Sequence, residues 1–400
     1  MIGLPPFLSF SENERTLQLK ILMIILRTVK NISSLNIAAS VLLFLAAILA
    51  AVVANSSLSP VYQDFLLQEL HLRIGNFNLF SHGGHPLKMI EFINDCLMTV
   101  FFLAVGLEIK RELLVGELSS VRKAALPFIA ACGGMVVPVV IYALSVASGT
   151  PETRGMAIPM ATDIAFSLGV LSLLGKRVPL SLKIFLTAFA VVDDIGGILV
   201  IALFYSADVA YGYLIAAAVL YVFLYYMGKF GVTQKIFFLF FGVIIWYLFL
   251  QSGIHSTISG VILAFVIPAR PRLDAGKYIE RIRDIIGEFP VSKSDNIVLT
   301  NAQIATLKQV ERASDYVISP LQSLEDNLHG VVSFVILPLF AFANAGVVFS
   351  GSGSIVGDVS IAVAAGLLLG KFLGIYLFTW LAVKSGVALM PAGMNWKNIA

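Results

Sequence analysis

The sequence predicts an all-α membrane protein that crosses the bilayer many times. Of its 400 residues, 58% are hydrophobic and only 13% are charged, whereas a soluble domain carries about 25% charged residues. The apolar residues form continuous runs of about 20, the length of a spanning helix, rather than the alternation of a barrel strand. This composition excludes a cytosolic enzyme, and the net charge of +3 leaves no basic surface for nucleic acid.

Ten apolar runs are long enough to be membrane spans. They cover roughly 35–54, 93–113, 124–147, 155–175, 180–205, 209–228, 234–251, 254–269, 329–350 and 357–383. The first 34 residues lack a cleavage site and contain a short basic-flanked apolar stretch, which predicts a cytoplasmic N-terminal extension over residues 1–34. The membrane domain then covers 35–400, with a charged and partly helical cytoplasmic insertion at 270–328.

The basic residues predict which side of the membrane each loop occupies. With the N-terminus inside, 23 of the 27 Lys and Arg residues fall on the inner side and three on the outer side. Such a bias is the positive-inside signal of multi-pass proteins, and it favours a cytoplasmic N-terminus. The outer loop at 56–92 contains His71, His82 and His85. Their spacing matches no paired metal-ligand motif, which favours a short hairpin over a metal site.

Ionisable residues inside the spans are the strongest functional signal. Asp163, Asp193, Asp194 and Lys371 lie within apolar runs, and Glu108 lies near the end of one. A central Asp or Lys costs about 2.5–3.5 kcal/mol on the insertion scale. A structural ion pair would account for one aspartate and the lysine, but it would leave two carboxylates without a reason.

The segment around Asp163 has the features of a broken helix. Pro159 removes a backbone hydrogen bond from the middle of the run, and Thr162 adds a hydroxyl beside the carboxylate. Exposed backbone at membrane depth requires a cavity or a protein lining. These oxygen donors suit a hard cation, although an ordinary proline kink remains an alternative.

Asp193 and Asp194 are adjacent, so on a helix their side chains point about 100° apart. We therefore expect one to face the cavity near Asp163 and the other to pair with Lys371, the basic residue placed within a span. The run from Gly366 to Lys371 resembles a phosphate-binding loop but has the wrong spacing, which argues against nucleotide binding.

Several long motifs, taken together, resemble the bacterial NhaA family of Na+/H+ antiporters. They are FFLAVGLEIKREL at 101–113, ATDIAF at 161–166, the pair at 193–194 and LPLFAFANAG at 337–346. The resemblance runs in order over about 93–268 and 329–391. Two differences are a longer inner insertion and Asp326, which stands where the family often has histidine.

The resemblance implies a fold of twelve helices with inverted repeats and discontinuous helices, so two more spans are expected beyond residue 400. It implies electrogenic exchange of Na+ or Li+ for H+, without a cofactor, in a bacterial inner membrane. Asp163, Asp194 and Thr162 would bind Na+ or protons, because cation and protons compete for the carboxylates. Asp193 would pair with Lys371. The partners would be the transported ions and the lipid bilayer, with a homodimer as an open option.

The same resemblance assigns Glu108, Arg111, Glu112 and His255 to pH response or to an ion-attracting funnel. For His255 a helix-terminal hydrogen bond is an equal alternative, and Asp95 is interpreted as a helix cap. Rival functions are a proton-coupled carrier of another solute, a channel, or an intramembrane aspartyl protease. The protease motif Gly-x-Gly-Asp is absent from the sequence, and the chain is not expected to be an enzyme.

Overall fold

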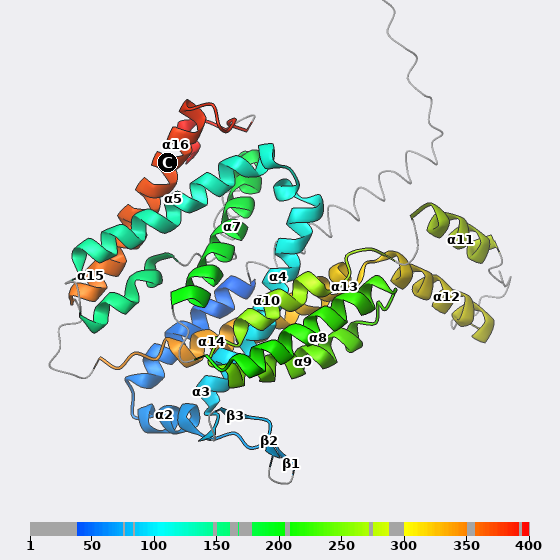
Figure 1. Cartoon of the computed structure of the whole chain (residues 1–400), viewed down its shortest axis with the longest axis horizontal. Coiled ribbons are helices and arrows are strands. Elements are labelled where there is room, and N and C mark those ends of the chain that lie inside the picture. The colour runs from blue at the N-terminus through cyan, green and yellow to red at the C-terminus, as the bar shows by residue number, and fades with distance from the viewer. Residues whose placement is uncertain are drawn as a thin grey trace, which may run out of the picture.

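The computed structural model is dominated by long apolar helices (Figure 1). It describes residues 38–74, 77–82, 85–146, 150–160, 167, 178–204, 209–271, 275–287, 300–349, 357–391 and 394–399. Within these ranges, six helical segments have the length and hydropathy of a span: Met89–Val115, Lys123–Ser145, Tyr211–Lys229, Lys235–Ser252, Pro320–Asn344 and Asp358–Lys384. A seventh candidate is the pair Ala38–Ala54 and α2 (Ser59–Leu67), bent by 113°. The predicted all-α polytopic class is confirmed.

One group of helices, here called the first bundle, packs around α4. Its members are α4 (Met98–Val115), α8 (Tyr211–Lys229), α9 (Lys235–Ser252), α10 (Thr257–Val266) and α13 (Pro320–Val331). Helices α10 and α13 lie against α4, and α8 lies against α9. The core between them is closed by large apolar side chains that are fully or almost fully buried, among them Leu107, Leu224, Phe238 and Ile245.

The contact between α4 and α10 brings two backbones unusually close. A Cβ atom added at Gly260 would clash with the carbonyl oxygen of Thr99 and would lie 3.0 Å from the backbone nitrogen of Leu103. Small residues permit such close approach between membrane helices, where van der Waals packing replaces the hydrophobic effect. The two helices are therefore a tightly fitted pair.

A second group, here called the second bundle, packs around α5. Its members are α5 (Val121–Ser145), the 3₁₀ helix η3 (Pro151–Met160), α7 (Leu180–Phe204), α15 (Asp358–Ala365) and α16 (Lys371–Lys384). Helix α16 packs most extensively on α5, and α7 packs on the same helix (Figure 1). Gly133 and Gly374 face each other, and a Cβ on either would collide with the carbonyl oxygen of the other.

In the part of the chain that the structure describes, three π-helical turns interrupt the long helices. They are η1 (Phe92–Leu97), between α3 (Met89–Glu91) and α4; η5 (Val332–Ile336), between α13 and α14 (Leu337–Asn344); and η6 (Gly366–Gly370), between α15 and α16. Single π turns of this kind are frequent at functional sites. The last of them ends directly before Lys371.

The loop after α2 folds as two short antiparallel hairpins. Strands β1 (Arg73–Ile74) and β2 (Phe77–Asn78) form the first, and β3 (Ser81–His82) and β4 (His85–Pro86) form the second. They lie beside α3, at the same end of the first bundle as the turn between α9 and α10 (Figure 1).

The charged insertion forms a helical hairpin of α11 (Ala275–Gly287) and α12 (Asn301–Val317), which lies beyond the opposite end of the first bundle (Figure 1). A hydrogen bond of 2.9 Å joins Tyr278 to Ser314 across the hairpin. Residues 320–328, which were included in the predicted insertion, form the first turns of α13. A short helix, α17 (Trp396–Ile399), follows α16 near the end of the chain.

Two boundaries differ from the sequence prediction for physical reasons. The span expected at 254–269 contains a helix of only 10 residues, α10, because Gly253 takes a left-handed turn with φ 81° and Pro268 follows the helix. The span expected at 329–350 begins earlier, at Pro320, and ends at Asn344. Charged residues in its first turns lower the local hydropathy, so the hydropathy pattern did not indicate where this helix begins. The N-terminal extension over 1–34 lies outside the described residues.

Candidate functional site

The second bundle contains an ion pair enclosed by the protein. The Lys371 ammonium donates a hydrogen bond of 2.9 Å to Oδ2 of Asp193, and the side chains are 13% and 1% exposed, respectively. Enclosing both charges costs desolvation energy of several kcal/mol per ion. The structure thus brings together the aspartate and the lysine that the sequence analysis expected to meet.

Packing around η6 sets the position of Lys371. A Cβ added at Gly370 would lie 2.7 Å from Cα of Pro138, and one at Gly366 would lie 2.8 Å from Cβ of Pro159. Both contacts are closer than a side chain tolerates, so the glycines let the π turn rest directly on two prolines. The lysine at the end of this turn is thereby held against α7.

Asp194 follows Asp193 in α7 and is partly exposed, in contrast to its buried neighbour. The difference agrees with the 100° separation of adjacent side chains on a helix. Thr162 and Asp163 lie outside the described residues, as does most of the span predicted at 155–175. The described part of that region is the 3₁₀ helix η3, in which Pro159 is fully buried.

A second ionic cluster lies at one end of the first bundle, here called the Arg111 end. The Arg111 guanidinium contacts the carboxylates of Glu112 at 3.0 Å and of Glu325 at 2.9 Å. Glu108 lies on the same helix, within electrostatic range of all three. Helix α4 supplies three of these residues and α13 supplies Glu325, so one cation is shared by carboxylates from two helices.

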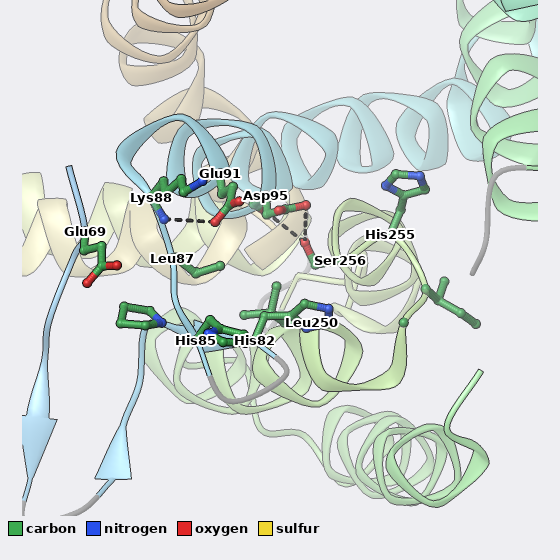
Figure 2. Close-up of a pocket in the computed structure, with 13 residues that line it drawn as sticks. Glu69, His82, His85, Leu87, Lys88, Glu91, Asp95, Leu250, His255 and Ser256 are labelled. Atoms are coloured by element: carbon green, nitrogen blue, oxygen red, sulfur yellow. Dashed lines mark hydrogen bonds between the residues drawn. The ribbon is translucent and has the colours of Figure 1, made fainter. Parts of the chain in front are cut away.

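His255 lies at the other end of the first bundle, beside a cavity of about 570 Å³. Figure 2 shows His82 and His85 from the hairpin β3–β4 and His255 from the turn before α10 around the same hollow, with Asp95 between them. Among the described residues, no group of three or more His, Cys, Asp or Glu side chains has an arrangement that could hold a metal ion.

Asp95 does not cap a helix, so that interpretation was wrong. The helix begins earlier, at Met89, where the Glu91 carboxylate accepts a hydrogen bond of 2.9 Å from the backbone N–H of the N-cap residue Lys88. Asp95 instead lies inside the π turn η1, and its backbone carbonyl accepts hydrogen bonds from the Trp246 indole and the Ser256 hydroxyl, both at 3.2 Å (Figure 2 shows the serine). Its role is to join α9 and the start of α10 to η1.

A family model described as Na+/H+ antiporter 1 matches residues 30–400 of this chain. The chain belongs to this antiporter family. The Na(+)/H(+) antiporter NhaA of Bacteroides thetaiotaomicron is 74% identical over 378 residues, which cover 94% of this chain and 86% of that protein. The protein of the same name from Bacteroides fragilis is 75% identical with the same coverage. That of Porphyromonas gingivalis is 46% identical over 380 residues, 94% of this chain and 84% of that protein.

Membership of the antiporter family confirms the resemblance drawn from the motifs. The chain is therefore a multi-pass bacterial membrane transport protein, and it is not an enzyme. Sequence reasoning missed one member of the Arg111 cluster, Glu325, and considered only its neighbour Asp326. The available signal was a carboxylate in the polar first turns of a spanning helix, which needs a buried or paired partner.

Proposed function

We propose that the protein is an electrogenic antiporter that exports Na+ or Li+ in exchange for protons. The observation that carries this proposal is the enclosed Asp193–Lys371 pair with Asp194 beside it on α7. Ionisable groups kept within a membrane bundle mark ion pathways and proton relays. The relatives named Na(+)/H(+) antiporter NhaA support Na+ and H+ as the transported ions.

The proposed mechanism is competition for one site. Asp163 and Asp194 bind either a sodium ion or protons, and Thr162 adds an oxygen donor. Carboxylate and hydroxyl oxygens are the ligands that a hard cation prefers. For proton binding to displace Na+, the two carboxyl groups must titrate near the working pH, and they do so as a coupled pair.

Asp193 and Lys371 have a different role in this scheme. Their ion pair holds α7 against α16, and it keeps Asp193 from competing with its neighbour for the cation. The loss of one partner leaves the other charge enclosed without compensation, which is strongly destabilising. We therefore assign the pair to stability and to coupling between ion binding and helix packing.

The distribution of basic residues indicates which side of the membrane each end of the first bundle faces, and we assign functional roles to the two ends on that basis. The bias of Lys and Arg supports a cytoplasmic position for the Arg111 end, the insertion at 270–328 and the extension at 1–34. Glu108, Arg111 and Glu112 then form part of an inner funnel that responds to pH and gathers cations, whereas His255 lies at the outer end. The membrane domain over 35–400 is in the inner membrane, in contact with lipid and compatible with a homodimer.

Everted membrane vesicles test the proposal. Vesicles are acidified by respiration, Na+ or Li+ is added, and recovery of a pH-sensitive dye reports proton movement. We expect the wild-type chain to give Na+-dependent recovery that increases with membrane potential. Recovery equal to that of vesicles lacking the protein would contradict antiport.

A further inference from the structure

Lys110 makes an unusual set of contacts at the Arg111 end of the first bundle. Its ammonium group donates hydrogen bonds to the backbone carbonyls of Phe265 at 2.7 Å, of Ala264 at 3.3 Å and of Ile267. All three acceptors belong to the C-terminal turn of α10 or to the residue that caps it. An ammonium group has three protons to donate, so this lysine can use all three in hydrogen bonds to the end of one helix.

The chemistry of a helix terminus explains why such contacts stabilise the structure. The last four carbonyls of a helix have no partner within the helix, and they form the negative end of its dipole. A lysine that donates to them satisfies their hydrogen bonds and opposes the dipole. Within a membrane bundle water is scarce, so these carbonyls need a partner from the protein.

The position of Lys110 connects this anchor to the ionic cluster. It stands next to Arg111 in α4, so one residue ties α4 to α10 and the following residue ties α4 to Glu325 of α13. The backbone nitrogen of Leu321 donates to the carbonyl of Pro268 at 3.2 Å, which joins the ends of α10 and α13. Each of the helices α4, α10 and α13 is therefore bonded to the other two at this end. The positions of the acidic residues here depend on where α4 lies along its own axis.

We propose that Lys110 is a positioning residue for ion exchange. By anchoring α4 to the C-terminal carbonyls of α10, it holds Glu108, Arg111 and Glu112 at the mouth of the inner funnel. This role rests on the proposed function, because it concerns how Na+ reaches the exchange site. Glu108, Arg111 and Glu112 from α4 and Glu325 from α13 interact electrostatically with one another, while α10 itself contains no ionisable residue.

The test compares Lys110→Met with Lys229→Met in everted vesicles, where the inner face meets the medium. Lys229 is an exposed residue in the last turn of α8, so its replacement removes the same charge from the same bundle and leaves the α10 carbonyls covered. We expect Lys110→Met to raise the KM for Na+ about two- to fivefold, the range that loss of a charge–dipole contact produces, with a smaller change in maximal rate. Lys229→Met should keep the wild-type KM.

Rescue separates positioning from simple stability. Lys110→Arg retains a charged donor and should return the KM toward the wild-type value, whereas Lys110→Gln should give an intermediate value and serves if the methionine variant does not fold. A lower Tm with unchanged KM and pH profile in Lys110→Met would overturn the positioning role. Absence of exchange by the wild-type chain would instead overturn the proposed function, so the two failures are distinguishable.

Discussion

The second bundle encloses one aspartate–lysine pair among apolar side chains, whereas the first bundle places an arginine between carboxylates of two helices at its end. Asp193 is 1% exposed, but the Arg111 and Glu325 side chains are 33% and 22% exposed. Solvent screens the contacts of Arg111 in the first bundle and weakens each of them. In the second bundle, enclosure instead makes Asp193 and Lys371 depend on each other. The comparison fits the proposed division of roles, in which the second bundle binds the ion and the first bundle controls access to it.

The largest expected effect is loss of exchange when one of the two proposed binding carboxylates is removed. In the proposed mechanism, Asp163→Asn or Asp194→Asn removes a carboxylate for which Na+ and protons compete, and we expect Na+-driven proton movement to fall to the background of empty vesicles. The measurement is dye recovery in everted vesicles, with protein amount checked by immunoblot. Normal exchange by either variant would remove that aspartate from the site.

Breaking the enclosed pair should affect stability most. Lys371→Met leaves Asp193 enclosed without its cation, which by analogy with buried pairs costs about 3–5 kcal/mol. We expect a large decrease of the Tm in detergent, and a smaller decrease for the double variant Asp193→Asn, Lys371→Met. Asp193→Asn alone should retain some exchange. If the double variant were less stable than both single variants, the pair would not be coupled.

Backbone contact in the second bundle gives a third test. Gly374→Ala would push a methyl group against the Gly133 carbonyl, and overpacking of this kind costs about 1–3 kcal/mol. Gly197, on α7 of the same bundle, has no atom within 4 Å of an added Cβ, so Gly197→Ala is the matched control. Thermal unfolding should show a decrease for the first variant and little change for the second. Equal Tm values would contradict the close packing of α5 and α16.

The smallest effect on stability is expected in the first bundle. Arg111→Gln removes contacts to Glu325, whose side chain is 22% exposed, and to Glu112, whose side chain is 11% exposed. Because the arginine itself is 33% exposed, solvent screens both contacts, and screened pairs contribute up to about 1 kcal/mol each. We expect a small change of Tm together with an altered pH profile of exchange, because Glu108, Glu112 and Glu325 lose their shared cation. A Tm decrease as large as that of Lys371→Met would invalidate the distinction between the bundles.

Sequence reasoning predicted the features that follow from the energetic cost of placing charges and backbone in a membrane. A charge in an apolar run is energetically costly, so Asp193 and Lys371 could be identified as candidate functional residues. Basic residues are scarce at membrane depth, which left Lys371 as the candidate partner for an aspartate. The all-α class followed from the length of the apolar runs in the same way. Both are local properties that a single sequence displays.

Distant contacts other than the Asp193–Lys371 pair were not predictable. Glu325 meets Arg111 across 214 positions of the chain, and its place in the first turns of a spanning helix indicates that it needs a partner but not which residue that partner is. Asp95 was interpreted as a cap because the π turn and the earlier start of its helix are not visible in the hydropathy pattern. The carbonyl anchor formed by Lys110 likewise depends on where α10 ends.

The most direct test of the central claim is Na+ binding to the purified protein at several pH values, measured by calorimetry. If Na+ and protons compete for Asp163 and Asp194, the apparent affinity for Na+ must fall as the pH is lowered, and binding must release protons into the buffer. Asp194→Asn should show neither effect. Sodium binding by the wild-type protein with an affinity that is independent of pH would contradict competition at these carboxylates.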